Sequence, residues 1–328
     1  MNAFTRAARQ ARLWVLLALC IVFAPLARAQ SDYPNRPIRM ILPWSTGGSS
    51  SNLMLYLGQK MAEDLGQPVV LENRPGANSV IGTNLLAKSA PDGYTMMLTT
   101  SGHVMLPYTT PNLPFDVIKD FTPVATLTNT QYALVVNPKI PARTLREFID
   151  LAKARPTEFF YGESGGSSHL AAEQFNLMTG TRLQRVPYAN KGAAAVLNDL
   201  VGGQIHAFFA PGVAPYVTAG RLRALAISGD GRSPALPDVP TFTEAGLPNF
   251  EVKVWYGILA PSGTPKPIVD RVSGSLARIL AMPEVKSALL QMDLDTFIST
   301  PEAFQSLMRA DKARYEKIIT DAKITFGS

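Results

Sequence analysis

TGGSSSN, from Thr46 to Asn52, follows a short apolar run typical of a buried strand and precedes a run with the apolar spacing of a helix. A second stretch of the same character, GESGGSS, extends from Gly162 to Ser168. A strand that turns through small residues into a helix points backbone N–H groups outward, and the helix dipole adds positive potential, so an anion can bind there. Because the chain carries this arrangement twice, we expect two lobes that grip one negatively charged solute.

The first 29 residues have the pattern of an export signal. Three arginines precede an apolar run from Leu13 to Leu26, and Ala27-Arg28-Ala29 fits a small-x-small cleavage site. We therefore expect a cleavable signal peptide over 1–29 and a mature exported protein that begins near Gln30. An uncleaved anchor is the alternative, although the apolar run is short for a membrane span.

Charge and cysteine content narrow the class of protein. The formal net charge is +6, and the export segment holds four arginines and no acidic residue, so its removal lowers the charge to +2. The mature chain then has no basic track for nucleic acid. Cys20, the single cysteine, lies in the same segment, so no disulfide is expected. About 300 remaining residues are more than one hydrophobic core usually holds, which favours two lobes.

Strands and helices are predicted to alternate, as in an α/β fold. Strands over 38–42, 69–71 and 94–99 enclose two helices, and this β-α-β-α-β start favours a parallel sheet with right-handed crossovers. The proline-rich segment 107–123 reads as a connector. Further strands are expected over 133–136, 159–162, 186–188, 205–210, 222–228 and 252–259, with helices over 145–154, 169–178, 193–201 and the C-terminal region. We assign 30–131 plus 251–328 to lobe I and 132–250 to lobe II, with crossings near Tyr132 and Glu251.

An enzymatic interpretation also has a motif behind it. Gly162-Glu163-Ser164-Gly165-Gly166 satisfies G-x-S-x-G, the nucleophile elbow of α/β hydrolases. A triad would require Asp199 and His206, the one downstream pair in the right order, and no upstream oxyanion motif is present. A secreted serine hydrolase is therefore the less favoured alternative. Scattered histidines, the lack of HExxH and the lack of a nucleotide phosphate loop predict no metal and no cofactor.

A series of short sequences, in a fixed order along the whole mature chain, resembles one receptor family. The chain is similar to the extracytoplasmic solute receptors of tripartite tricarboxylate transporters, the Bug family. The resemblance rests on YPNRPIRMILPW with Gly47-Gly48, GQPVVLENRPGANSVIG, PDGYTMML, FTPVATL, YGESGGSSHLAAEQF, VPY with GAAAVLNDLVGGQI, GRLRALAISGDGRSPALPDVPTFTEAGLP and WYGILAPSGTP.

This resemblance implies a location in the periplasm and a two-lobed periplasmic-binding-protein fold of type II, the Venus flytrap, in which each lobe is a mainly parallel sheet flanked by helices. It implies capture of a small carboxylate, either a di- or tricarboxylate or an aromatic acid, without catalysis. The implied partners are the membrane subunits of the transporter, and a monomer without cofactor is expected. A sensing module of the same fold that serves a signalling partner is the alternative.

The resemblance also implies which residues hold the ligand, mainly through backbone N–H groups of the two glycine/serine loops. The loop after the strand over 94–99 would line the same cleft. The expected ligand-binding residues are Trp44, Ser45, Thr46, Gly47, Gly48, Ser49, Ser50, Ser51, Ser101, Gly102, Ser164, Gly165, Gly166, Ser167, Ser168, Tyr188 and Trp255. For the three aromatic residues in this set, packing within a lobe competes with a role as an apolar wall, and the same two interpretations apply to His103 and Tyr216.

Two departures from the family pattern bear on the ligand. The family usually has an acidic residue and an arginine where this chain has Ser51 and Leu55. Without that acid, a ligand ammonium group has no obvious partner, so an amino acid is a less favoured ligand. Lys191 lies in a segment that is longer than usual, and either faces solvent or pairs with a distal ligand carboxylate.

Overall fold

The structure is a computed structural model. It describes residues 33–44, 46, 49–188, 192–229, 231–250, 252–321 and 324. Several sequence-based predictions fall outside this described part of the chain: the export segment over 1–29 and the residues Ser45, Gly47, Gly48, Lys191 and Glu251.

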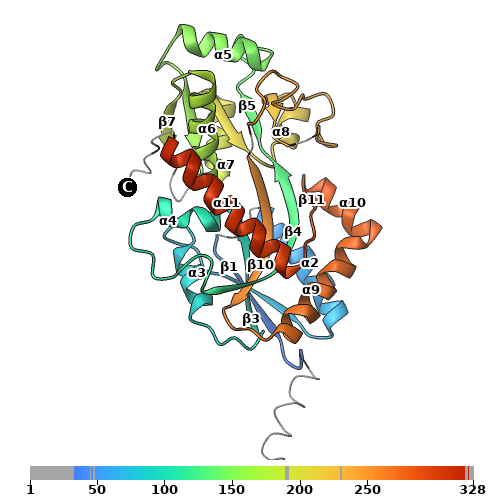
Figure 1. The fold of residues 1–328 in the computed structure, drawn as a ribbon. Helices are drawn as coiled ribbons and strands as arrows, with labels where there is room; N and C mark the ends of the chain where they lie inside the picture. The colour runs from blue at the N-terminus through green and yellow to red at the C-terminus, as the bar shows by residue number, and fades with distance from the viewer. Residues whose placement is uncertain are drawn as a thin grey trace, which may run out of the picture.

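One lobe is built on a six-stranded sheet, which we call sheet A (Figure 1). Its strand order is β11-β4-β10-β3-β1-β2, with β1 (Ile38–Leu42), β2 (Val69–Asn73), β3 (Thr95–Thr100), β4 (Phe121–Gln131), β10 (Lys253–Pro261) and β11 (Asp295–Thr296). Apolar side chains fill both faces of the sheet in two separate clusters. The elements that cover it are α2 (Ser49–Leu65), α3 (Val80–Ala87), the 3-10 helix η1 (Ser101–Met105), α4 (Leu106–Thr109), α9 (Lys266–Ala281), α10 (Pro283–Gln291) and α11 (Pro301–Asp321).

The other lobe is built on a five-stranded sheet, sheet B, with the order β7-β6-β8-β5-β9. Its strands are β5 (Ala133–Val136), β6 (Phe160–Glu163), β7 (Gln184–Pro187), β8 (Ala207–Ala210) and β9 (Arg223–Ile227). They are covered by α5 (Leu145–Ala154), α6 (Gly166–Thr179), α7 (Gly192–Gly202) and α8 (Ala214–Thr218). Two further apolar clusters lie on the two faces of this sheet, so each lobe has its own core.

A local sequence signal explains where α5 begins. Thr144 caps α5, because its hydroxyl accepts a hydrogen bond from the N–H of Glu147 at 3.2 Å. The Glu147 carboxylate in turn accepts the N–H of Arg143 at 2.6 Å. Thr144 and Glu147 thus form a capping box in which the reciprocal bond is displaced by one residue.

The two-lobed fold is confirmed, but both sheets are mixed rather than mainly parallel. β1 pairs parallel with β2 and β3, and β6 pairs parallel with β7 and β8, as the alternating pattern predicts. β10 runs antiparallel to β3 and β4, and β5 runs antiparallel to β8 and β9. The reason lies in the crossings: β5 and β10 each enter a lobe from the side of the other lobe. They therefore run against strands whose carboxyl ends point toward that side.

The segment predicted as a connector contains more structure than expected. It includes most of α4 and the start of β4, where Pro123 pairs with Leu259 beside an irregular register. A proline lacks the N–H of a regular ladder, so the pattern is not that of an ordinary strand. The boundaries of the two lobes stay a prediction. Sheet membership changes between Gln131 and Ala133 and again between Ile227 and Lys253.

Candidate functional site

A cavity of about 360 Å³ lies between the two sheets, where the carboxyl ends of their parallel strands face one another. Its walls come from the segments that follow β1, β2 and β3 in sheet A and β6, β7 and β8 in sheet B. Crevices at the carboxyl ends of parallel strands are the usual ligand sites of α/β folds. The predicted residues that it brings together are Trp44, Ser50, Gly102 and the whole second loop, Ser164–Ser168.

The other predicted residues within the described chain do not line this cavity. Thr46 is exposed, Ser49 begins α2, and Ser51 and Ser101 are buried. Tyr188 is buried in lobe II and donates its hydroxyl to Asp199 at 2.5 Å.

Trp255 belongs to the core of lobe I. Its side chain is 2% exposed and lies edge-on to Phe304, and Nε1–H donates to Asp311 at 2.7 Å. Of the two interpretations open for Trp255, this geometry supports packing. Trp44, by contrast, is half-buried and lines the cavity.

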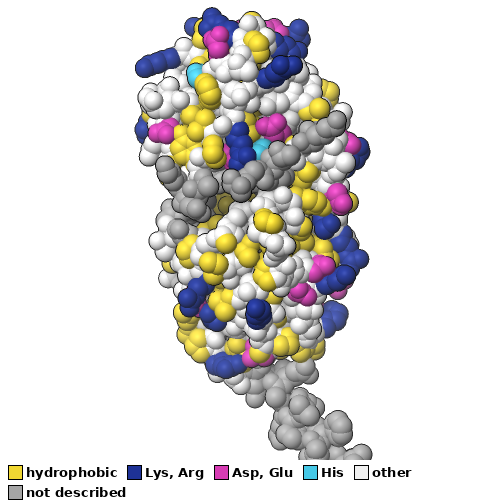
Figure 2. Space-filling model, turned by 90° about the vertical axis from the view of Figure 1, so that its left-hand side faces the viewer, with side chains coloured by type: hydrophobic (Ala, Val, Ile, Leu, Met, Phe, Trp, Pro, Cys, Tyr) yellow, Lys and Arg dark blue, Asp and Glu magenta, His cyan; other side chains and the backbone are white. Residues whose placement is uncertain are grey.

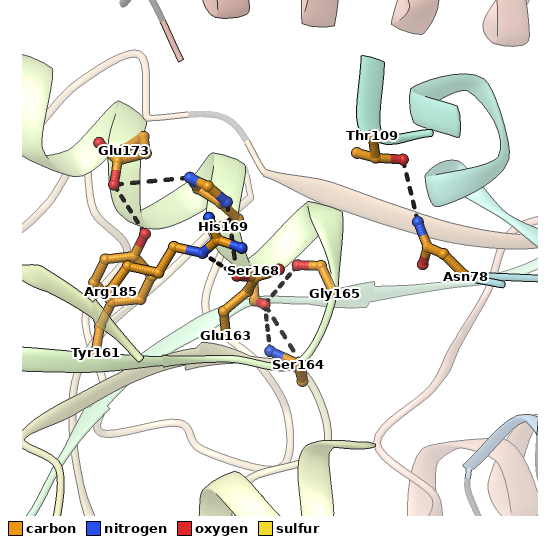
Figure 3. Close-up of polar contacts among 10 residues, drawn as sticks. All are labelled: Asn78, Thr109, Tyr161, Glu163, Ser164, Gly165, Ser168, His169, Glu173 and Arg185. Carbon is orange, nitrogen blue, oxygen red and sulfur yellow. Dashed lines mark hydrogen bonds and ion pairs between the residues drawn. The ribbon is translucent and has the colours of Figure 1, made fainter. Parts of the chain in front are cut away.

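Ser168 fastens the second loop to the first turn of α6. Its Oγ donates to the carbonyl of Gly165 at 2.8 Å and accepts the N–H of Ser164 at 3.0 Å (Figure 3). The N–H of Ser164 is therefore already used. The first N–H groups of a helix have no acceptor within the helix, and the N-cap residue Gly165 provides no side-chain bond. The first-turn N–H groups of Gly166, Ser167 and Ser168, for which the helix provides no acceptor, are therefore the candidate donors for an anion.

The N-terminus of α6 touches lobe I across the cleft. A Cβ atom at Gly166 would lie 3.1 Å from Cγ2 of Thr109 and 3.4 Å from Cε of Met105. Ser167 Oγ also contacts Met105 Sδ at 3.8 Å. A side chain at position 166 would therefore require Thr109 or Met105 to shift by a few tenths of an ångström.

The loop between β2 and α3 forms a cleft wall that the sequence analysis missed. Asn78 and Ser79 line the cavity, and Asn78 donates its amide to Thr109 Oγ1 at 3.1 Å (Figure 3). Ala77, Asn78 and Ser79 have φ values of 46°, 51° and 71°, three successive non-glycine residues in the left-handed region. Such strain often marks a functional site. The turn-rich sequence here was the signal that could have found this wall.

A polar network lies directly behind the second loop (Figure 3). Glu163 forms an ion pair with Arg185, and the buried His169 lies 3.8 Å from Glu163 and 3.9 Å from Glu173. Tyr161 donates its hydroxyl to Glu173 at 2.8 Å. Burial, with a smaller effect of Arg185, lowers the pKa of His169 to about 4. The guanidinium of Arg185 offsets a carboxylate that would otherwise repel an anion at the adjacent loop.

The described lining of the cavity contains no Lys, Arg, Asp or Glu. Polar groups alternate with aromatic and apolar ones, including Trp44, Tyr132, Tyr256 and Val254. On the face of the molecule shown in Figure 2, Lys and Arg side chains are spread over both lobes and mixed with Asp and Glu. An anion in the cleft would thus meet backbone and side-chain dipoles among these residues rather than formal positive charges.

The residues of the hypothetical hydrolase triad have other partners. Asp199 accepts the hydroxyl of Tyr188, and His206 Nδ1 accepts the N–H of Phe160 at 3.1 Å. His206 lines a separate cavity of about 280 Å³ on lobe II.

Within the described ranges, no group of three or more His, Cys, Asp or Glu could hold a metal ion. A search of the same ranges finds no helix with both the length and the apolar character to cross a bilayer.

Comparisons with known proteins agree with this architecture. Residues 55–324 match the family model described as "Tripartite tricarboxylate transporter family receptor" (TctC). Protein BugT of Bordetella pertussis is 35% identical over 323 residues, which cover 95% of this chain and 98% of BugT. A structure titled "R. palustris Rpa4515 with adipate" is 32% identical, with a TM-score of 0.84 and coverage of 90% of this chain and 99% of that one.

A third relative is similar over the same extent. MatC from Rhodopseudomonas palustris, solved with bound malate, is 29% identical with a TM-score of 0.79 and covers 88% of this chain and 100% of its own. The family match covers well over half of the chain, and the similarity to BugT extends over nearly all of it. The chain therefore belongs to the tripartite tricarboxylate transporter receptor family, the solute-binding proteins that include the Bug receptors.

Proposed function

We propose that this protein captures a small carboxylate in the cleft between its lobes and delivers it to the membrane subunits of a tripartite tricarboxylate transporter. The observation that carries the proposal is the meeting of Trp44, which precedes the first loop, and Ser50, which belongs to it, with the whole second loop around one cavity. The adipate and malate bound to two relatives support a carboxylate as the class of ligand.

The expected contacts on lobe II are the N–H groups of Gly166, Ser167 and Ser168 at the positive end of α6. A helix terminus stabilises an anion by up to ~2 kcal/mol when partly buried, and charge-assisted hydrogen bonds add ~1.5–3 kcal/mol each. One loop alone would hold a carboxylate weakly. With both loops in contact with the ligand, the free energy of binding would be about −8 kcal/mol, which corresponds to a micromolar Kd. Contacts to both lobes exist only when the cleft is closed, so the ligand shifts the population toward closure.

The body of the ligand would pack against the uncharged wall of the cleft. Trp44, Tyr132 and Tyr256 supply aromatic surface there, and Met105 and Val254 add aliphatic surface. We propose that Trp44 contributes an apolar wall for the ligand, one of the two interpretations that its sequence position left open.

We further propose that 1–29 directs the chain to the periplasm and is removed, and that the receptor acts as a monomer without enzymatic activity.

Calorimetric titration of the mature protein tests the ligand class. The panel contains adipate, malate, citrate, benzoate and neutral amides of the same acids as controls. We expect a micromolar Kd for at least one acid and no binding of its amide. Failure of every acid to bind would refute the proposal. Hydrolysis of an ester by the wild type and its loss in Ser164→Ala would favour the hydrolase alternative instead.

The partner is tested separately by co-purification from membranes. Capture of the transporter membrane subunits with the ligand-loaded receptor supports delivery for uptake. Capture of a sensor kinase in their place would instead support the sensing module of the same fold.

A further inference from the structure

Tyr256 brings a hydroxyl group to the lobe I wall of the cleft. It lies on β10, and its side chain is 8% exposed. Val254 and Tyr256 both line the cavity, whereas Trp255 between them is buried in the core of lobe I. Because successive side chains of a strand point to opposite sides, the side of β10 that carries Tyr256 faces the cleft.

The hydroxyl of Tyr256 has no hydrogen-bond partner among the residues that the structure describes. Its oxygen is not enclosed by neighbouring atoms and retains accessible surface. Since Tyr256 lines the cavity, this surface opens into the cleft. The hydroxyl of a largely buried tyrosine normally has a partner, so an unbonded one on a cavity wall points to a group that arrives in the cavity.

The protonation state of Tyr256 defines what that group must offer. Burial raises the pKa of Tyr256 to about 12, so the hydroxyl keeps its proton at physiological pH and can donate it without carrying a charge. The described lining supplies no Lys or Arg, so an anion in this cleft depends on uncharged donors of this kind. A hydrogen bond to an ionised acceptor is about twice as strong as one between neutral groups.

Tyr256 also lies close to the place where α6 meets lobe I. It pairs with Thr100 at the end of β3, two residues before Gly102. A Cβ atom at Gly102 would lie 3.9 Å from Ser167 Oγ in the first turn of α6. Burial raises the pKa of Tyr132, Tyr256 adds to this increase, and a side-chain hydrogen bond with Ser167 opposes it. Tyr132 is therefore within interaction range of both groups.

We infer that Tyr256 is a ligand-binding residue of lobe I whose hydroxyl donates a hydrogen bond to a carboxylate oxygen of the bound acid. This inference rests on the proposed carboxylate-binding function and assigns a side-chain donor to its site. The ligand then accepts from the N-terminus of α6 on one side and from β10 on the other. A contact of this kind links the bound acid to both lobes.

Tyr256→Phe tests the inference, because it removes the hydroxyl and keeps the ring. Calorimetry compares the variant with the wild type for adipate, malate, citrate and benzoate. For the acids that bind the wild type, we expect the affinity to fall by about fivefold or more. A smaller loss would overturn the inference while the carboxylate receptor stands. No binding of any acid to the wild type would refute the proposed function and this inference with it.

Tyr33→Phe is the matched control. Tyr33 packs against the same core cluster of lobe I, but its hydroxyl already donates to the carbonyl of Gly93 at 2.7 Å. We expect Tyr33→Phe to lower the melting temperature and to leave the affinity unchanged. Tyr256→Phe should weaken binding and leave the melting temperature of the ligand-free protein nearly unchanged, since no bond within the described residues is lost. If Tyr256→Phe destabilises the protein as much as Tyr33→Phe, its loss of affinity would be structural and the inference would fail.

A measurement on the wild type does not depend on either variant. The ¹³C resonance of the Tyr256 Cζ atom reports on whether the hydroxyl donates to an anion. It should move downfield when the tightest-binding acid is added, and it should stay in place when the neutral amide of that acid is added. A resonance that does not respond while calorimetry shows the acid to be bound would overturn the inference.

Discussion

Asp293 Oδ2 accepts a hydrogen bond from the backbone N–H of Gly212 at 3.1 Å, which joins the turn between α10 and β11 of lobe I to the segment after β8 of lobe II. Thr130 braces the same turn, since its hydroxyl donates to the Asp293 carbonyl at 3.1 Å. Pro211, the neighbour of Gly212, lines the cleft. A polar contact between the lobes thus lies next to a wall of the candidate site.

We expect the burial of the Asp293 carboxyl group at this contact to make the stability of the protein depend on pH. Burial raises the pKa of Asp293 to about 6, the Gly212 N–H acts against this, and Asp295 adds a smaller increase. Because the folded state holds the proton more tightly than the unfolded state, the stabilisation is fully present below about pH 4 and is lost as the pH rises through 6.

Asp293→Asn isolates the effect of the buried charge on stability, because the amide oxygen can still accept the hydrogen bond from the Gly212 N–H but carries no charge. At pH 7.5 we expect the free energy of unfolding to rise by about 1–2 kcal/mol, as one pKa unit corresponds to about 1.4 kcal/mol. At pH 4 the variant and the wild type should differ little. Thermal unfolding at pH 4, 5, 6 and 7.5 measures this. A variant that is less stable at every pH would show that the charge itself strengthens the contact.

Ser168→Ala removes both bonds that fasten the second loop to α6. Each is worth about 1 kcal/mol, so the affinity for the best-binding acid should fall by up to about thirtyfold. Ser164→Ala is the matched control. Its hydroxyl makes only a 3.5 Å contact with Ser168, so we expect less than a threefold loss. Titration calorimetry of both variants gives the answer, and the reverse order of effects would contradict this account of the loop.

Gly166→Ala should disfavour the closed cleft, because the new methyl group presses on Thr109 and Met105. We expect ligand affinity to fall by about tenfold, equivalent to about 1.4 kcal/mol, with small-angle scattering that indicates a more open molecule. Gly231→Ala is the control, as a Cβ atom there meets no neighbour within 4 Å. Unchanged affinity in Gly166→Ala would mean that the lobes bind ligand without this approach.

Arg185→Ala should weaken binding of a dianion more than binding of a monoanion, because the Glu163 carboxylate behind the second loop loses the guanidinium that offsets its charge. The loss of this half-buried ion pair should also lower the free energy of unfolding by about 2 kcal/mol. Glu163→Gln in the same chain should restore most of the affinity. Arg182→Ala, an exposed residue of the same segment, is the control. Equal losses for both anions would argue against an electrostatic cause.

The two tryptophans of the described chain should respond differently to substitution. Trp44→Phe should abolish most of the fluorescence change on ligand addition and leave the melting temperature nearly unchanged, because Trp44 lines the cleft. Trp255→Phe should keep that response but lower stability by about 1–2 kcal/mol, since it loses the bond to Asp311 and packing beside Phe304. A ligand response that survives in Trp44→Phe and disappears in Trp255→Phe would reverse this assignment.

Local patterns allowed much of the fold to be predicted. The strand over 38–42 and the helix over 145–154 have the predicted bounds, because alternation, apolar spacing and a capping box act within a few residues. The strand β4 was missed, since Pro123 breaks the local pattern while its pairing partner Leu259 is far away in the sequence. The reversed direction of β5 and β10 depends on where the chain crosses between lobes, which no short window contains.

Some features of the candidate site could likewise be predicted from the sequence, and others are seen only in the tertiary structure. The sequence by itself determined two loops of small residues at strand-to-helix turns and a family resemblance, since these features are local. Only the tertiary structure decided that Asn78 meets Thr109, that Trp255 is core, that Ser168 consumes the Ser164 N–H and that Tyr256 lines the cleft. Such contacts arise when distant segments pack, and their partners depend on geometry that residue type alone does not specify.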